Sequence, residues 1–137
     1  MNELEKFKIW FSGLVDGEGC FTSVIREGSI NFRFKINLRA DDKSILFLIK
    51  DYLGFGKVVY EPYIRRKTFI NGNPQYKYVI YNREDRQKII DLLTKYPLRT
   101  KKKKDFDIWV KLHNLERNNL KEGERLVREL HEVKKFS

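Results

Sequence analysis

The chain has 137 residues, and 29 Lys and Arg against 19 Asp and Glu give it a formal net charge of +10 and a pI near 9.7. One domain is the expectation at this length, and 41% hydrophobic residues can supply its core. The single cysteine excludes an internal disulfide and disfavours a cysteine-based metal site. The positive charge indicates a polyanionic partner, and nucleic acid is favoured over a membrane because no run approaches the ~18 consecutive apolar residues of a spanning helix.

The first residues of the chain are acidic and do not have the layout of a signal peptide. We therefore expect an intracellular protein. Ala40 is the single alanine, whereas Lys, Ile, Asn, Phe and Tyr are abundant. This bias favours an AT-rich genome, such as that of an organelle (mitochondrion or chloroplast), a phage or a bacterium.

An amphipathic helix is predicted over residues 2–17, because its apolar residues recur at i, i+3, i+4 and i+7. Gly13 and Gly17 are four residues apart and share one side of that helix. Each glycine costs about 1 kcal/mol of helix propensity, and the expected return is the close approach of another helix. Asp16 and Glu18 follow at the helix end, and Gly19 terminates it.

Two strands are predicted next, over residues 19–27 and 30–39, joined by a turn at Gly28. Residues 30–39 alternate between apolar and polar side chains, as in a half-buried antiparallel strand. The polar side carries three cations and no acid, which indicates a surface for phosphates and base edges. A merely solvated strand is the alternative. The polar residues are Arg33, Lys35, Asn37 and Arg39.

The remaining pattern predicts a helix capped by Asp42, a strand pair over 57–64 and 75–82, a helix opened by Asn82 or Glu84, and two later helices. A long basic loop joins the second strand pair. The resulting order is α-β-β-α-β-β-α with a helical tail. We therefore predict an α+β fold with a four-stranded antiparallel sheet, a single domain over 1–137, a core over about 1–112 and a tail over about 113–137.

Residues 11–19, FSGLVDGEG, resemble the motif that names the LAGLIDADG homing endonucleases. Four positions match the motif outright, three are conservative replacements, and Phe11 and Gly17 depart from it. A helix C-terminus with two solvated acids is the alternative interpretation. The α-β-β-α-β-β-α order agrees with the core of that family. The matching residues are Gly13, Leu14, Asp16 and Gly19.

The resemblance implies that two motif helices pair, so a chain with one motif forms a homodimer. It implies that the acid at Glu18, helped by the carbonyl of Gly17, binds Mg²⁺ or Mn²⁺, since these ions prefer oxygen ligands. The acid at Asp16 is then mainly structural. Lys101 is the closest match to a lysine that the family places near the active site. The expected dimer contacts are Trp10, Gly13, Leu14 and Gly17.

A polar residue, often Gln, commonly stands at the end of the second strand in this family. Here that place falls on the apolar Ala40, which departs from the family pattern. DNA contacts are expected from both strand pairs and from the basic loop. They are Cys20, Thr22, Val24, Arg26, Arg33, Lys35, Asn37, Arg39, Arg65, Arg66, Lys67, Tyr76 and Tyr78.

The resemblance implies a site-specific endonuclease that cleaves double-stranded DNA at a long, near-palindromic target by metal-assisted hydrolysis. Two other functions stay open. One is an RNA maturase that binds intron RNA, and the other is a non-cleaving DNA-binding regulator that keeps the motif as a dimer contact. The departure at Ala40 favours these alternatives.

Overall fold

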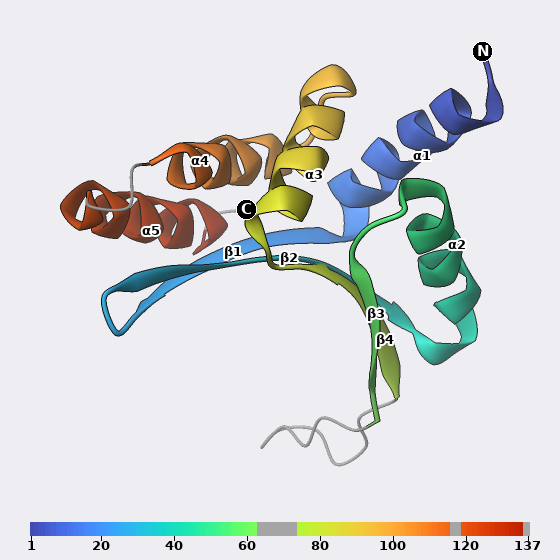
Figure 1. Ribbon diagram of the computed structural model, residues 1–137, viewed down its shortest axis with the longest axis horizontal. Helices are drawn as coiled ribbons and strands as arrows, with labels where there is room; N and C mark the ends of the chain where they lie inside the picture. The colour runs from blue at the N-terminus through green and yellow to red at the C-terminus, as the bar shows by residue number, and fades with distance from the viewer. Residues whose placement is uncertain (63–73, 116–118, 136–137) are drawn as a thin grey trace.

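The computed structural model describes residues 1–62, 74–115 and 119–135. Five helices and four strands follow one another in the predicted order (Figure 1). Their bounds are α1 Glu3–Glu18, β1 Gly19–Arg26, β2 Ser29–Arg39, α2 Lys43–Leu53, β3 Lys57–Glu61, β4 Gln75–Ile80, α3 Arg83–Lys95, α4 Lys102–Asn114 and α5 Leu120–Lys135, with a 3-10 turn at Ala40–Asp42.

The strands form one antiparallel sheet in the order β1-β2-β4-β3. Gly19 pairs with Ile36, so the end of α1 is placed directly beside the middle of β2. The helices cover one face of the curved sheet and leave the other uncovered (Figure 1). The predicted α+β fold with its four-stranded antiparallel sheet is therefore confirmed.

Alternation along the strands separates the two faces of the sheet, because successive side chains point to opposite sides. Phe21, Phe34 and Ile36 are fully buried under the helices. Their neighbours Cys20 and Lys35 are paired across β1 and β2 and point to the uncovered side. We call this uncovered side the open face. Its described residues on β1, β2 and β4, of which Val79 is buried, are Cys20, Thr22, Val24, Arg26, Ser29, Asn31, Arg33, Lys35, Asn37, Arg39, Gln75, Lys77 and Val79.

Helix α1 begins at the cap residue Asn2, whose side-chain oxygen accepts from the backbone N–H of Glu5 at 2.8 Å. One side of the helix is buried through Phe7, Phe11 and Val15, which follow each other at four-residue spacing. Gly19 ends the helix in extended geometry, so the chain runs straight from α1 into β1.

Helices α4 and α5 close the outer edge of β1, where backbone groups would otherwise be unpaired. The indole N–H of Trp109 donates to the Thr22 carbonyl at 3.1 Å, and His131 Nε2 lies 3.3 Å from the Ser23 carbonyl oxygen. Leu126 and Leu130 of α5 belong to the same hydrophobic cluster as the sheet. The C-terminal helix is thus packed into the core.

Several element ends differ from the predictions by one to three residues. The second strand pair ends at Glu61 and Ile80, short of the predicted 57–64 and 75–82. Asp42 does precede α2, but its side chain makes no capping hydrogen bond, so the predicted cap is wrong. Asn82 rather than Glu84 opens α3, and it accepts from the N–H of Asp85 at 2.9 Å.

Candidate DNA-binding and cleavage site

The carboxylate of Asp16 ties the end of α1 to the loop that precedes α4. Both of its oxygens lie 3.0 Å from the backbone nitrogen of Arg99, and Oδ1 also accepts from the N–H of Thr100 at 3.1 Å. The Thr100 hydroxyl donates to the same oxygen at 2.8 Å. Both oxygens are thus used in holding the loop, which supports the structural role expected for Asp16.

Two opposing effects act on the pKa of Asp16. Desolvation raises it, but hydrogen bonds from Thr100 and Arg99 and the charge of Lys102 favour the ionised form. Their sum leaves the pKa of Asp16 below its ordinary value. The carboxylate is therefore ionised at neutral pH and acts as a fixed acceptor.

Glu18 lies two residues further on, at the last position of α1, and its side chain is exposed. Within residues 1–62, 74–115 and 119–135, no hydrogen bond or ion pair of this carboxylate is found. The helix end that carries it has free carbonyls and a partial negative charge. A carboxylate beside such carbonyls offers hard oxygen donors to a divalent cation.

One chain supplies only part of a metal site. In the described residues, no group of three or more His, Cys, Asp or Glu side chains could hold an ion. Glu18 and the carbonyl of Gly17 fit Mg²⁺ or Mn²⁺ in chemistry, because both are oxygen donors, and they leave most coordination positions to other groups. Waters, phosphate oxygens or further carboxylates are the kinds of donor that could fill those positions.

The lysine run at the start of α4 approaches Asp16 through Lys102. Lys102 is partly buried and its charge acts on both Asp16 and Asp105. Lys101, the residue favoured from sequence, is exposed at the helix start. The role of Lys101 stays a prediction, and Lys102 is the lysine whose charge acts on Asp16.

The open face carries the predicted strand cations. Arg33 and Arg39 are exposed and Lys35 is partly exposed. Arg39 lies 3.8 Å from Asp41, whereas Arg26, Arg33 and Lys35 make no ion pair within the described part of the chain. The cations are thus available for an external anion. The predicted contacts Arg65, Arg66 and Lys67 lie outside the described residues.

Two predicted DNA contacts are wrong because the parity of β4 was assigned incorrectly. Tyr78 is fully buried under the helices, and its hydroxyl donates to the Phe55 carbonyl at 2.7 Å. Tyr76 lies on the same side of β4 and packs on Tyr60, with ring centroids 4.9 Å apart. The open-face residue between them is Lys77, which forms an ion pair with Glu61 and was missed.

Ala40, where the family resemblance puts a polar residue, lies directly after β2, in the 3-10 turn. Its N–H donates to the Pro74 carbonyl at 3.3 Å. Asn37 is the open-face residue of β2 beside the end of α1, since its neighbour Ile36 pairs with Gly19. Its Oδ1 is buried without a hydrogen-bond partner among the described residues. The departure at Ala40 stays a prediction, and Asn37 is a polar side chain that β2 offers beside the motif.

The predicted contact side of α1 is uncovered. Trp10 keeps 44% of its surface exposed, and a Cβ added at Gly13 or Gly17 would meet nothing within 4 Å. Leu14, on the same side, is partly buried. The opposite side is the buried one. An apolar stripe with two glycines therefore faces outward next to Glu18.

Comparison with known proteins places the chain in a family. Residues 11–113 match the family described as LAGLIDADG endonuclease. Among curated relatives, the probable intron-encoded endonuclease 4 of Neurospora crassa is 30% identical over 109 residues, which is 80% of this chain and 18% of the relative. The probable intron-encoded endonuclease Cox1-I1b of Schizosaccharomyces pombe is 33% identical over 110 residues, or 77% of this chain and 26% of the relative. The chain thus spans about a fifth to a quarter of the length of these relatives.

Solved structures give the same result. The LAGLIDADG meganuclease I-AabMI, bound to uncleaved DNA, has a TM-score of 0.71 and 32% identity over 90% of this chain and 43% of its own. An archaeal intron-encoded homing endonuclease complexed with DNA has a TM-score of 0.73 and 26% identity over 94% of this chain and 85% of its own. Together with the motif at the end of α1 and the sheet beside it, these matches show that the chain belongs to the LAGLIDADG endonuclease family.

Proposed function

We propose that this protein is a site-specific endonuclease that cleaves double-stranded DNA with the help of Mg²⁺ or Mn²⁺. The observation that carries the proposal is the carboxylate of Glu18, which is exposed, has no partner among the described residues and lies beside a cationic open face. The family and the DNA-bound structures of similar proteins support it. The named relatives are intron-encoded endonucleases, so an intron-encoded origin belongs to the same proposal.

Each part of the site has a separate task in this proposal. The open face holds the duplex, with Arg26, Arg33 and Lys35 against phosphates or base edges. Asp16 holds the loop that brings Lys102 to the same end of α1. Glu18 supplies oxygen donors at that end. A bound divalent ion would stabilise charge on the cleaved phosphate and help activate a water.

Asn37 fits a role in holding the attacking water. Its amide oxygen has no hydrogen-bond partner among the described residues, and its residue position adjoins the strand residue paired to Gly19. An amide can both accept from and donate to a water molecule. This restores a polar group where the apolar Ala40 was expected to weaken the activity.

The second motif helix comes from a second copy of the chain in our proposal. The exposed stripe of Trp10, Gly13 and Leu14 supports it, because small residues let two helix backbones approach closely. A two-fold axis along this contact would bring two Glu18 side chains together. The dimer would then read a near-palindromic site. The intracellular location, with a preference for an organelle, stays a prediction.

None of the helices in the described residues is long and apolar enough to cross a membrane.

An RNA maturase and a non-cleaving DNA regulator remain the competing functions. Digestion of a randomised target library with Mg²⁺, followed by sequencing of the cleaved ends, tests the main proposal. Enrichment of one long, nearly symmetric site is expected. Tight binding of intron RNA without cleavage of any duplex would instead support the maturase.

A further inference from the structure

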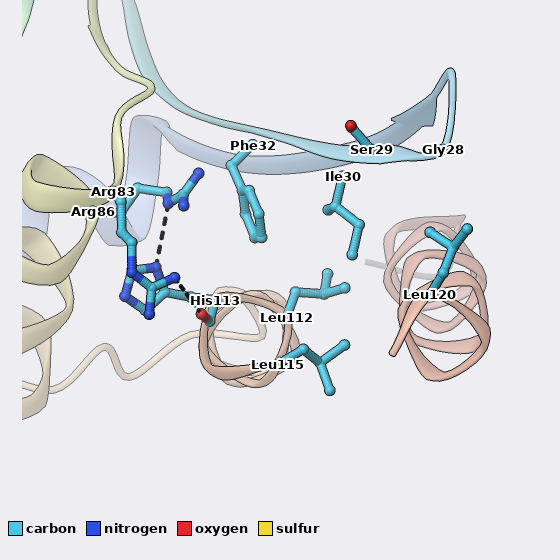
Figure 2. A pocket seen from close by; sticks show the side chains of 10 residues that line it. All are labelled: Gly28, Ser29, Ile30, Phe32, Arg83, Arg86, Leu112, His113, Leu115 and Leu120. Carbon is cyan, nitrogen blue, oxygen red and sulfur yellow. Dashed lines mark hydrogen bonds between the residues drawn. The ribbon is translucent and has the colours of Figure 1, made fainter. Parts of the chain in front are cut away.

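A second cationic site lies on the helix-covered side of β2. It is a pocket of about 370 Å³ bounded by β2, α3, the end of α4 and the start of α5 (Figure 2). Ligand pockets in proteins begin at about this size. Figure 2 shows two guanidinium groups entering from α3 and aliphatic side chains on the opposite wall. The aliphatic residues are Ile30, Leu112, Leu115 and Leu120.

Arg86 is held rigidly at the polar end of the pocket. Its guanidinium carbon lies 3.9 Å from the ring centroid of Phe32, a cation–π contact. Its Nε donates to His113 Nδ1 at 3.2 Å, and its Nη1 donates to the Tyr81 carbonyl at 3.1 Å. Arg83, one turn earlier, donates from Nη1 to the His113 carbonyl at 3.3 Å. These contacts leave some N–H donors of each guanidinium group available for a ligand.

The histidine between the two arginines is neutral in this arrangement. Nδ1 accepts from Arg86, so Nε2 carries the proton and donates to Gln87 Oε1 at 2.9 Å. Burial, and then the charges of Arg86 and Arg83, lower the pKa of His113, while Asp91 acts in the other direction. The positive charge of the pocket is thus carried by the two arginines.

Neither Arg83 nor Arg86 forms an ion pair within the described residues, and the end of α4 offers only about half a negative charge. Burial and then the charge of Arg83 lower the pKa of Arg86 to about 10. One guanidinium, that of Arg83 on the His113 carbonyl, is enough to cap the end of α4. An anion in the pocket would offset the remaining charge.

The pocket is also continuous with the open face. Residues 29–33 of β2 extend beyond the part of β2 that pairs with β4, so this strand edge is uncovered by β4. A second hollow, of about 510 Å³, is lined by Arg26 and Arg33 and shares Ile30, Phe32 and Arg86 with the first. A nucleic-acid strand leaving the open face would meet Arg86 at this edge.

We propose that this pocket is a second nucleic-acid site that binds one nucleoside phosphate, with the phosphate on Arg83 and Arg86 and the base against the aliphatic wall. Two guanidinium groups match a phosphate in charge and geometry. The aliphatic wall can bury an apolar ring. The nucleoside phosphate comes either as a free nucleotide or as part of a single strand, because both carry the same recognised groups.

Calorimetric titration of the full chain with AMP, adenosine, inorganic phosphate and a short single-stranded oligonucleotide tests the proposal. AMP or the oligonucleotide should bind at least tenfold more tightly than adenosine and than phosphate alone. A higher affinity for the oligonucleotide identifies the strand as the source, and an equal affinity identifies the free nucleotide. No saturable binding of either nucleotide ligand by the wild type would overturn the site.

Arg83→Gln removes one guanidinium at an exposed position and should weaken binding of AMP about tenfold, the equivalent of ~1.4 kcal/mol. Lys88→Gln removes a cation from the same helix outside this pocket and is the matched control, expected within twofold of wild type. If Arg83→Gln lowers the melting temperature, Leu120→Glu adds an opposing charge to the aliphatic wall of the pocket instead. Unchanged AMP affinity in the folded variants would refute the site. Duplex affinity should stay unchanged in Arg83→Gln, which separates this pocket from the open face.

Discussion

The two carboxylates at the end of α1 are two residues apart and have opposite surroundings. Asp16 points toward the loop before α4, where three donors of Arg99 and Thr100 hold it. Glu18 is exposed and has no partner among the described residues. The Asp16 side of the helix end is built for stability, and the Glu18 side is left available for a ligand. Gly17 lies between the two acids in the sequence.

This difference could be predicted only in part from the sequence. The motif distinguished the acids because the family resemblance gave them different roles. Two of the three donors, the N–H groups of Arg99 and Thr100, are backbone groups more than 80 residues away. Backbone donors leave no mark in composition or periodicity, so the loop contact could not be derived.

The open face shows the same limit. Alternation over residues 30–39 predicted which side of β2 is polar, since every second residue there is apolar. In β4, tyrosine, lysine and valine do not separate so cleanly, and Tyr78 was placed on the wrong side. Its pairing with Ile36 settles the parity, and that register depends on the tertiary fold.

The largest expected effect is on cleavage by Glu18→Gln. The amide keeps the size of the side chain but removes the charge that would hold a divalent ion, so cleavage should fall by several powers of ten. Duplex binding should be retained or strengthened, because repulsion from phosphate is relieved. Cleavage rates and gel-shift affinities with Mg²⁺ measure both.

Glu5→Gln, an equal change at the exposed start of α1, is the control and should cleave like wild type. Equal cleavage by Glu18→Gln and Glu5→Gln would remove Glu18 from the mechanism.

The next effect separates the two lysines at the start of α4. Lys102→Ala should reduce cleavage about 10²-fold, since one electrostatic donor is lost near the motif acids. Lys101→Ala should change it less than about threefold, because an exposed charge is screened by solvent. Single-turnover rates at saturating protein compare them directly. A larger loss in Lys101→Ala would restore the assignment made from sequence.

Asp16→Ala tests the stabilising side of the comparison. Backbone donors of Arg99 and Thr100 lose their acceptor, which should cost about 1–3 kcal/mol of unfolding free energy. Urea unfolding followed by circular dichroism measures it. Asp91→Ala, which removes an acid bonded to Gln87 within α3, is the control and should cost less than about 0.5 kcal/mol. Equal stability of the two variants would mean that the loop is held by other contacts.

A smaller effect is expected for the binding surface. Lys35→Gln should lower duplex affinity several-fold and reduce the salt slope by about 1, if this lysine contacts one phosphate. Lys8→Gln, on α1 and away from the open face, should leave the slope unchanged. Affinities at four salt concentrations give both slopes. An unchanged slope in Lys35→Gln would argue against phosphate contact by this residue.

The smallest effect is the pH dependence that Asp16 adds to stability. Its folded pKa lies below the ordinary value, so the unfolded chain takes up its proton first as the pH falls. The stabilisation is therefore complete above about pH 5, where both states are ionised, and is lost as the pH drops through about 4 and then through the folded pKa. Melting temperatures of wild type and Asp16→Asn should differ by a constant amount from pH 5 to 7 and converge toward pH 3. Asp105, whose pKa is raised by burial, titrates in both proteins, so the difference between them cancels its contribution. If the difference in melting temperature stays constant down to pH 3, the negative charge of Asp16 does not stabilise the loop, and only its hydrogen bonds do.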